Sequence, residues 1–404
     1  MTNLIYLANA RMPTEKAHGL QIAQMCEAFA EANCEVTLVV PQRHNTARLR
    51  NQDPWEYFGV HPVFKIKRLW TIDIVRFLPR PIQSAGFILQ TICFYLSVIA
   101  WLRGQPSDVV LYSREIYLHL LLGRTFAGRF RVYEAHRTNH TRFGLWAQEQ
   151  VLRSSSVVIA LTKHLASVLE AQAHRPVLVE HDGVRAARFV NIPSREEART
   201  MLRISPKSFV AGYLGQLQTL GMDKGVGTVV EAFKLCFQDR TNWSGNLLVV
   251  GGPEDKAQAL RQSWVHSGMP ENTFHAPGHV PASDVPTYLA ACDVCIMPHP
   301  WTEFFAYHTS PLKLFEYMAA GKAILATDMP VFHEVLTAGE NALFVPPSDP
   351  KAMAQALLRL SDDRKLRDRI SANNLEAVKY YTWDARAQRI LNEIESRRSS
   401  IPLE

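Results

Sequence analysis

The stretch FVAGYLGQLQTLGMDKGVGTVVEAFKLCFQDRTNWSGNLLVV, residues 209–250, decides the fold. It begins with an apolar run, Phe209–Leu214, and ends with a second one, Leu247–Val250, and both are typical of buried strands. Between them a loop reaches Lys224-Gly225, and apolar residues at helical spacing predict a helix over Val229–Phe237. A strand, a helix and a strand in this order form a βαβ unit with parallel strands, so the stretch predicts an α/β domain.

The same alternation continues toward the C-terminus. Strand-like runs occur at Thr273–Ala276, Val294–Met297 and Ile324–Thr327, and helical patterns separate them. Strands that alternate with helices predict a doubly wound parallel sheet, whose ligands bind at the carboxyl ends of the strands.

The N-terminal half repeats this pattern. It opens with the strand-like run Leu4–Ala8, a helical pattern from Ile22 and a second run, Val36–Val40. Further strand-like runs are Val109–Tyr112, Arg131–Tyr133, Val157–Leu161 and Pro176–Val179. The chain of 404 residues is also too long for one hydrophobic core. We therefore expect an α/β protein of two doubly wound, Rossmann-like domains that face each other across a cleft.

The boundary between the domains is expected near the polar segment Asn191–Lys207. We assign residues 1–188 to the N-terminal domain and residues 189–380 to the C-terminal domain. The tail Trp383–Arg398 has a helical pattern, so we expect a helix within residues 381–404 that closes the N-terminal domain.

Charge and cysteine content narrow the function classes. The formal net charge is +6, from 44 basic and 38 acidic residues, which suits a phosphorylated ligand or an anionic membrane. No nucleic-acid-binding motif accompanies this charge, so we expect no nucleic acid partner. The six cysteines are dispersed, which predicts free thiols. Cys292 and Cys295 have metal-ligand spacing but lie in a strand-like run without a second pair, so we expect no metal site there.

Two N-terminal features concern localisation. The first residues show no basic and apolar leader pattern, so we expect a cytoplasmic protein. The uncharged stretch Pro81–Leu102 reaches membrane-spanning length, but a strand pattern follows directly at Val109–Tyr112, which favours a buried or peripheral helix over a transmembrane one. Before it, Phe64–Arg80 interleaves cations with large apolar residues. Two interpretations stay open for this segment: peripheral contact with an anionic membrane, on the inner face of the cell membrane, or a loop with a solvated basic edge.

A helix start in the C-terminal half suits a phosphate. In the segment HTSPLKLFEYMAAGK, residues 308–322, Ser310 is a good N-cap and Pro311 suits the first helical position. The free N–H groups of Leu312 and Lys313 then point outward at the positive end of the helix dipole. The ammonium group of Lys313 adds a cation, so we expect an anion to bind here.

Two further residues are candidates on position alone. Glu316 lies about one and a half turns into the same helix, where its carboxylate is placed to accept hydrogen bonds from ribose hydroxyls. The alternative is a solvated glutamate on an ordinary capped helix. Lys224 supplies a cation just before a helix and is placed to stabilise a departing diphosphate. The alternative is a surface lysine beside a turn glycine.

Several motifs together resemble one family. They are Lys224-Gly225, Glu231-Ala-Phe, Gly278-His-Val, Tyr288-Leu-Ala-Ala-Cys-Asp-Val, Ser310-Pro-Leu-Lys-Leu-Phe-Glu-Tyr-Met-Ala-Ala-Gly-Lys322, His18-Gly19, Glu134-Ala-His136, Ala160-Leu-Thr-Lys163 and His181-Asp-Gly-Val184 before Phe189. In order and spacing they resemble the family 4 retaining glycosyltransferases of bacterial glycan and lipopolysaccharide synthesis, which have the GT-B fold. The resemblance covers nearly the whole chain and implies an acceptor side in the N-terminal domain and a nucleotide-sugar site in the C-terminal one.

The resemblance implies roles for single residues. Lys224 and the helix start at Leu312 and Lys313 would hold the donor diphosphate, Glu316 the ribose, and His136 the sugar near the reacting centre. We expect the catalytic residues to be His136, Lys224 and Glu316. We expect donor contacts from Gly19, Gln216, Val280, His308, Thr309, Ser310, Leu312 and Lys313. Gly19 would let the first loop approach the donor, and the backbone near Val280 would contact the base. His140 and His181 match the family pattern less closely.

Two positions depart from the family. His308 stands where the family usually has a glutamate that touches the donor sugar, although a neutral imidazole can also donate to or accept from a sugar hydroxyl. Gln216 stands where an arginine is common, which leaves Lys224 and Lys313 to balance the phosphate charge. We expect these changes to bear on the identity of the donor.

The main hypothesis is a retaining hexosyltransferase, independent of metal ions, with a nucleoside-diphosphate sugar as donor and a glycan or glycolipid as acceptor. No cofactor is expected, because the nucleotide sugar is a substrate. Two alternatives stay open: a GT-B-like nucleotide-binding protein without turnover, suggested by His308 and Gln216, and a sugar-nucleotide epimerase, which would act without an acceptor.

Overall fold

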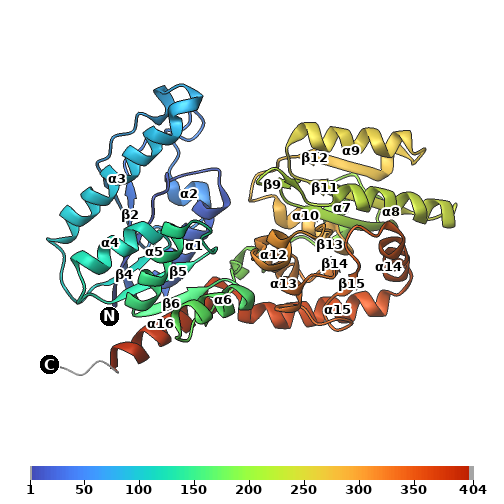
Figure 1. Ribbon diagram of the computed structural model, residues 1–404. Coiled ribbons are helices and arrows are strands. Elements are labelled where there is room, and N and C mark those ends of the chain that lie inside the picture. The colour runs from blue at the N-terminus through green and yellow to red at the C-terminus, as the bar shows by residue number, and fades with distance from the viewer. Residues whose placement is uncertain (1, 400–404) are drawn as a thin grey trace. The chain divides into compact units, whose positions relative to one another are not determined.

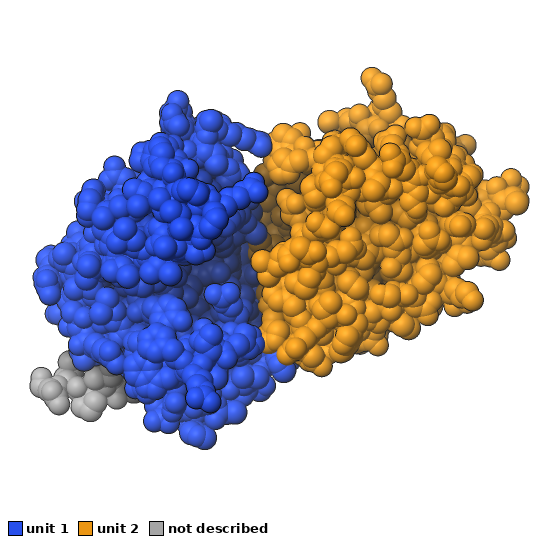
Figure 2. Space-filling view, turned by 45° about the horizontal axis from the view of Figure 1, so that its top comes forward, with its two compact units in different colours: residues 1–182, 383–404 blue, residues 183–382 orange. Residues whose placement is uncertain are grey.

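The computed structural model describes residues 2–399 and contains two compact units (Figures 1 and 2). Unit 1 comprises residues 1–182 and 383–404, of which residues 1 and 400–404 lie outside the described part. Unit 2 comprises Gly183–Thr382. Each unit has one principal parallel sheet with helices on both faces, as Figure 1 shows.

The sheet of unit 1 has the strand order β3-β2-β1-β4-β5-β6-β7, and neighbouring strands pair in parallel. The strands are β1 Thr2–Leu7, β2 Cys34–Pro41, β3 Lys65–Leu69, β4 Val110–Ser113, β5 Arg131–Ala135, β6 Val157–Ala160 and β7 Leu178–Val179. The chain builds outward from β1 to β3 and then returns to β4 on the other side of β1. This reversal is the topological switch point of a Rossmann-like sheet.

The helices of unit 1 cover both faces of that sheet. They are α1 Ala17–Glu31, α2 Pro54–Phe58, α3 Gln83–Leu102, α4 Ile116–Thr125, α5 Arg142–Ser154, α6 Lys163–Ala173 and α16 Trp383–Ser399, with single 3₁₀ turns η1 Val75–Phe77 and η2 Arg80–Ile82. Buried residues of α3, such as Phe94 and Val98, pack against Leu111 of β4 on one face. Helix α16 is the helix expected within residues 381–404, and it belongs to unit 1.

The principal sheet of unit 2 has the order β12-β11-β8-β13-β14-β15, so β8 and β13 flank a second switch point. The strands are β8 Phe209–Leu214, β11 Gly245–Val250, β12 Phe274–Gly278, β13 Val294–Met297, β14 Ala323–Thr327 and β15 Leu343–Val345. A small hairpin of β9 Gln218–Thr219 and β10 Met222–Asp223 lies in the loop after β8. The strands predicted from residues 209–250 are thus confirmed.

Helices also cover both faces of the sheet in unit 2. They are α7 Arg195–Met201, α8 Val226–Asp239, α9 Glu254–His266, α10 Val285–Ala291, α11 Glu303–Tyr307, α12 Leu312–Ala319, α13 Pro330–His333, α14 Pro350–Asp362 and α15 Arg364–Ala377, with 3₁₀ turns η3 Ala186–Phe189, η4 Glu271–Thr273 and η5 Val378–Tyr381. Two apolar clusters, one on each face, form the core.

The segment Asn191–Lys207 is not the linker that its polarity indicated. It contains α7, which begins with a capping box between Ser194 and Glu197. The side chain of Arg199 in α7 is fully buried and pairs with Asp293 at 2.6 Å. The units instead divide before Gly183, six residues earlier than the expected boundary after residue 188, because Val184 and Phe189 pack in the core of unit 2.

Besides the small hairpin of β9 and β10, two strands were not predicted. The edge strand β3 contains Lys65, Lys67 and Arg68, and its charges made the segment look like a loop. Charged residues on an edge strand are a common protection against pairing with other chains. The strand β15 spans only Leu343–Val345, which is too short to stand out from the surrounding sequence.

Candidate active site

The switch point of unit 2 brings the two loops after β8 and β13 together. Gly225 lies at the start of α8 with φ +82°, and a Cβ atom there would clash with the carbonyl oxygen of Pro298. Glycine is therefore required both by the backbone conformation and by the close approach of the two loops. Asp223 accepts a hydrogen bond from the N–H of Gly225 at 2.6 Å and so fixes the turn.

Lys224 stands in this turn as a half-buried cation. Burial and the positive charge of Lys313 lower the pKa of Lys224 to about 8. Within residues 2–399, no carboxylate forms an ion pair with Lys224. A desolvated ammonium group without a counter-ion favours the binding of an anion beside it. Lys224 therefore provides an electrostatic reason to expect an anion at this point.

His299 follows β13 beside Lys224. Its ring packs edge-on against Phe305 and Phe332, with centroid distances of 4.9 and 5.6 Å. Burial, with a smaller effect of the charge on Lys224, lowers the pKa of His299 to about 3. The imidazole therefore stays neutral and adds no charge. The sequence contained one signal for this residue, its place just after the carboxyl end of a strand.

Helix α12 begins one residue later than we predicted. Pro311, with φ −76° and ψ 107°, is the N-cap, and Leu312 is the first helical residue. The expectation that Ser310 caps the helix and Pro311 opens it is therefore wrong by one position. Helical backbone geometry starts only after Pro311, and no side chain caps the helix. The N–H groups of Leu312 and Lys313 remain at the free end, as expected.

Glu316 is buried in α12 and held between two cations. Lys313 Nζ donates to Oε2 of Glu316 at 2.6 Å, and Arg188 Nη1 lies 3.5 Å from Oε1. Arg188 also donates to the carbonyl oxygen of Ala282 at 2.6 Å. The alternative of a solvated glutamate is wrong, because Glu316 is only 7% exposed. Arg188 was missed because nothing local marks the partner of a residue so distant in the sequence.

The other donor-contact candidates of unit 2 lie in loops around these elements. His308 caps α11 by donating its N–H to Phe304 at 3.0 Å, and Thr309 Oγ1 donates to Phe305 at 3.3 Å. The loop 308–311 thus connects α11 to the start of α12. Val280 packs on the apolar core after β12, and Gln216 is exposed after β8.

His136 follows β5 in unit 1 and uses both of its ring nitrogens. Nε2 lies 2.6 Å from Oε1 of Glu134, and Nδ1 lies 2.9 Å from Nη2 of Arg114. An arginine only donates and a carboxylate only accepts, so the ring is neutral with its proton on Nε2. Burial, with Arg114 next in effect, lowers the pKa of His136 to about 4. Side chains, and not backbone groups, are therefore the partners of both ring nitrogens.

Glu134 is anchored by the last helix of the unit. Arg386 of α16 donates to Oε2 of Glu134 at 3.0 Å, and the hydroxyl of Tyr112 donates to the same oxygen. Burial alone would raise the pKa of Glu134, but Arg386 and His136 outweigh it and hold the pKa well below its usual range. Arg386 was missed, because its role depends on how α16 docks. Arg114 follows β4 and could have been found by its place at a strand end.

Gly19 has a packing role in unit 1. It lies inside α1, where a Cβ atom would clash with Thr14 and lie 3.0 Å from the ring of Phe58. The neighbouring residue Gln21 donates to Asp182 and accepts from Nη1 of Arg114 at 2.6 Å. His181 joins the same network through its carbonyl oxygen, which accepts from Arg386 at 2.9 Å. His140 lies in the loop after β5.

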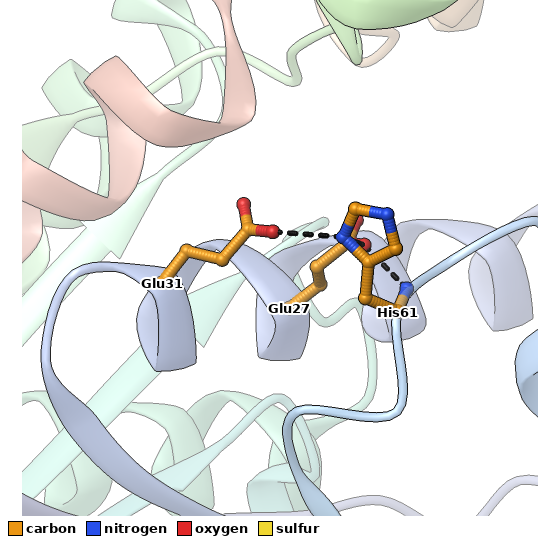
Figure 3. Close-up of side chains that lie close together, drawn as sticks. All are labelled: Glu27, Glu31 and His61. Atoms are coloured by element: carbon orange, nitrogen blue, oxygen red, sulfur yellow. Dashed lines mark hydrogen bonds and ion pairs between the residues drawn. The ribbon is translucent and has the colours of Figure 1, made fainter.

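A cluster of Glu27, Glu31 and His61 has the residue types of a metal site (Figure 3). Nδ1 of His61 lies 3.1 Å from Glu31 and 3.4 Å from Glu27, and Glu27 also accepts from the N–H of His61 at 2.6 Å. These contacts join the loop before β3 to α1. His61 and Glu31 are exposed, so hydrogen bonds and ion pairs account for the cluster and we assign no metal to it.

Residues 208–363 match the family described as glycosyl transferases group 1. These residues make up most of unit 2, so the sequence of unit 2 resembles that of the group 1 glycosyltransferases. Its Lys224, Lys313 and Glu316 all lie within the matched residues. The GT-B architecture predicted from the sequence is confirmed by structures that superpose on nearly the whole chain.

Relatives and solved structures support this assignment. The glycosyltransferase is 26% identical over 287 residues to the lipopolysaccharide core biosynthesis mannosyltransferase LpsB of Rhizobium meliloti, which covers 68% of the chain and 76% of LpsB. It is 31% identical over 180 residues, 44% of each chain, to the phosphatidyl-myo-inositol mannosyltransferase of Mycobacterium leprae. Anabaena HepE in complex with UDP superposes with a TM-score of 0.70 at 17% identity, covering 98% of this chain and 100% of HepE. Sucrose-phosphate synthase from Thermosynechococcus elongatus does so with a TM-score of 0.74 at 16% identity, covering 99% and 100%.

Proposed function

We propose that this glycosyltransferase moves a hexose from a nucleoside-diphosphate sugar to a glycan or glycolipid acceptor in the cytoplasm, during the synthesis of a cell-surface polysaccharide. The observation that carries the proposal is the half-buried ammonium group of Lys224, whose pKa is lowered to about 8 by burial and by Lys313. A diphosphate at the switch point would stabilise both cations. The structural likeness to HepE in complex with UDP and the mannosyltransferase activities of two relatives support the donor and acceptor classes.

Unit 2 would bind the donor. Its diphosphate would accept hydrogen bonds from the N–H groups of Leu312 and Lys313 and from the ammonium group of Lys224. Glu316 would accept hydrogen bonds from the ribose, and its contacts with Arg188 and Lys313 hold the carboxylate in place. Loop residues His308, Thr309 and Ser310 would face the sugar, and the backbone near Val280 and Gln216 would approach the nucleotide.

The reaction breaks the bond between the anomeric carbon and the diphosphate, whose oxygen keeps the electron pair. The acceptor oxygen bonds to that carbon, and its proton passes to the departing diphosphate. Negative charge therefore develops on the leaving group, where Lys224 and the start of α12 would stabilise it. These fixed positive groups would stabilise the leaving group in place of a metal ion, so we propose that the reaction is independent of metal ions. We also propose that it retains the configuration at the anomeric carbon.

Unit 1 would supply His136 to the sugar. Because Arg114 and Glu134 occupy both ring nitrogens, His136 would contact a sugar hydroxyl by sharing its Nε2 proton or by releasing Arg114. An imidazole with a pKa of about 4 carries no charge at neutral pH, so the ring of His136 would orient the substrate without adding charge.

Ligand-dependent melting tests the donor proposal. UDP, GDP and ADP are added in turn to the full chain, with EDTA present. A nucleotide at about 100 times its dissociation constant should raise the free energy of unfolding by roughly 2.7 kcal/mol. Failure of all three nucleotides to bind would overturn the proposal.

Turnover tests the transfer itself. Nucleotide sugars of the base that binds are incubated with lipid-linked and free glycan acceptors, and the linkage of the product is determined by NMR. We expect the product to keep the anomeric configuration of the donor. Lys224→Met should remove turnover, whereas Lys207→Met, an exposed lysine of the same unit, should not. Nucleotide binding without transfer to any acceptor would favour a protein that binds nucleotide without turnover.

A further inference from the structure

One surface of unit 1 is strongly apolar. Among residues 2–399, nine of the 22 exposed large hydrophobic side chains lie between residues 70 and 96. They are Trp70, Ile74, Phe77, Ile82, Phe87, Ile88, Leu89, Ile92 and Leu96. We call these nine residues the α3 surface. Soluble proteins rarely expose so many large apolar residues together unless the patch binds something.

Helix α3 has an apolar outer face as well as an apolar inner face. Its inner face, which includes Phe94, Val98 and Leu102, is buried in the core of unit 1. Ile88, Ile92 and Leu96 follow one another at intervals of four residues and so form one stripe on the opposite face. They are 59%, 52% and 61% exposed. The outer face of a surface helix is normally polar, so this stripe is the reverse of the usual pattern.

The α3 surface is held in place by the rest of the unit. Ser97 Oγ donates to the carbonyl oxygen of Trp70 at 2.8 Å, and Thr71 Oγ1 donates to that of Gln90 at 2.9 Å. Gly86 lies so close to Leu78 that a Cβ atom would clash with its side chain. The exposed residues therefore project from fixed backbone, and Figure 1 shows α3 at the outer side of the unit.

The exposed charges of this surface are basic, and Asp73 in the same segment is nearly buried and pairs with Arg43 at 3.8 Å. Residues 74–107 contain no aspartate or glutamate, but they contain Arg76, Arg80 and Arg103. The guanidinium group of Arg76 lies 4.5 Å from the ring centre of exposed Phe77. The adjoining edge strand adds Lys67 and Arg68, whereas its Lys65 pairs with Glu35 at 2.8 Å. Apolar side chains interleaved with cations are typical of surfaces that bind anionic lipid headgroups.

We propose that the α3 surface docks on an anionic lipid bilayer, with the outer stripe of α3 in the apolar layer and the arginines at the phosphate level. The helix is long and apolar enough to cross a membrane by length and composition. Its inner face, however, belongs to the core with Leu111 and Leu118, so a spanning position would take that core apart. The helix therefore lies on the membrane. This inference goes beyond sugar transfer and does not depend on it.

A second copy of the chain fits the surface less well. A two-fold contact would bring the same patch of both copies together, so Arg76 and Arg80 would face like charges. Residues 74–107 offer no carboxylate to compensate. An anionic bilayer supplies the missing negative charge. Charge complementarity thus favours lipid as the occupant.

Vesicle co-sedimentation tests the proposal with the full chain. Vesicles of phosphatidylcholine alone are compared with vesicles that also contain phosphatidylglycerol. We expect binding to the anionic vesicles and a loss of most of it in Ile88→Gln/Leu96→Gln. The control Met201→Gln/Val265→Gln changes two residues of unit 2 that are 66% and 48% exposed, and it should bind like the wild type.

The arginines are tested separately. Each cation at a membrane surface contributes about 1 kcal/mol, so Arg76→Ala/Arg80→Ala should weaken binding to anionic vesicles roughly thirtyfold. Lys207→Ala/Lys256→Ala removes two exposed lysines of unit 2 and should leave binding unchanged. High salt should reduce wild-type binding and narrow the difference between the wild type and the arginine variant.

Trp70 reports the depth of insertion, since it is 65% exposed. Brominated lipids should quench fluorescence in the wild type and quench it less in Trp70→Phe. The proposal is overturned if wild-type protein does not bind anionic vesicles, or if both glutamine pairs reduce binding equally. Dimerisation in ultracentrifugation that Ile88→Gln/Leu96→Gln abolishes, without vesicle binding, would assign the surface to a second copy. None of these measurements requires a nucleotide or an acceptor, so their outcome is independent of the sugar-transfer tests.

Discussion

Lys313 and Glu316, one turn apart on α12, share a hydrogen bond of 2.6 Å between Nζ and Oε2. Arg188 approaches the other carboxylate oxygen at 3.5 Å. Both oxygens of a buried carboxylate thus face cations, and Lys313 is shared between that carboxylate and any anion at the start of the helix. In the proposed donor site, this ion pair would therefore couple the recognition of phosphate to that of ribose.

Glu316→Gln should separate these two effects. The variant lacks the charge that accepts from ribose but releases Lys313 toward the phosphates. A hydrogen bond to a charged group contributes about 1.5–3 kcal/mol, so the affinity for UDP relative to pyrophosphate should fall roughly tenfold or more. Calorimetry with both ligands measures this ratio. In the control Glu340→Gln, an exposed glutamate of the same unit, the ratio should not change; equal ratios in Glu316→Gln and wild type would remove Glu316 from the ribose site.

Much of the fold follows from short-range patterns. Strands such as β8 and β13 begin and end at the residues expected, because a buried parallel strand reads as a continuous apolar run. The same rule did not predict the strand β3, because its position at the sheet edge leaves Lys65, Lys67 and Arg68 in solvent. An edge strand needs no apolar face, so its sequence resembles a loop.

The parts of the candidate site that could be predicted are those marked by a single residue in the local sequence. Lys224 and the start of α12 follow from a turn glycine and a proline that local rules interpret correctly to within one residue. Arg188 and Arg386 act through Glu316 and Glu134, which lie far away in the chain. Such ion pairs depend on how the helices pack against the rest of the unit, so no local sequence pattern predicts them. Burial of Glu316 was missed for the same reason.

Donor binding should depend on pH through Lys224. Its folded-state pKa of about 8 lies below the ordinary value of 10.5, so the free protein loses this proton as the pH rises through about 8. An anion binds better to the protonated form, and its affinity should therefore fall above pH 8, by at most about tenfold per pH unit. Isothermal titration with the nucleotide between pH 7 and pH 10 measures the change.

Lys224→Arg provides the matched variant for that titration, because a guanidinium group stays charged over the whole range. Its affinity should be nearly flat where the wild type declines. Lys207→Arg should behave like the wild type, since this exposed lysine lies elsewhere in unit 2. A decline of the same size in Lys224→Arg would mean that another group controls the binding.

Removing Arg386 should destabilise unit 1. Arg386→Met leaves the buried carboxylate of Glu134 without its principal cation, and breaking one side of a buried pair costs about 3–5 kcal/mol. Hydrogen exchange of α16 peptides measures the loss. Arg397→Met on the same helix breaks only an exposed pair with Glu393 and should cost less than about 1 kcal/mol. Adding Glu134→Gln to Arg386→Met should restore part of the stability, because no buried charge remains unpaired.

Asp182 should give unit 1 a stability that falls with pH. Burial raises the pKa of Asp182 from 3.8 to about 7, so between these values the folded protein keeps a proton that the unfolded chain releases. The free energy of unfolding then decreases as the pH rises through this window, by at most about 1.4 kcal/mol per pH unit. Asp182→Asn cannot ionise, and its stability should decline less between pH 4 and pH 7 than that of the wild type. Exposed Asp284→Asn serves as the control and should retain the wild-type slope in hydrogen exchange of unit 1 peptides. If the slopes of wild type and Asp182→Asn coincide, Asp182 is ionised in the folded protein and its contact with Gln21 stabilises the charged form instead.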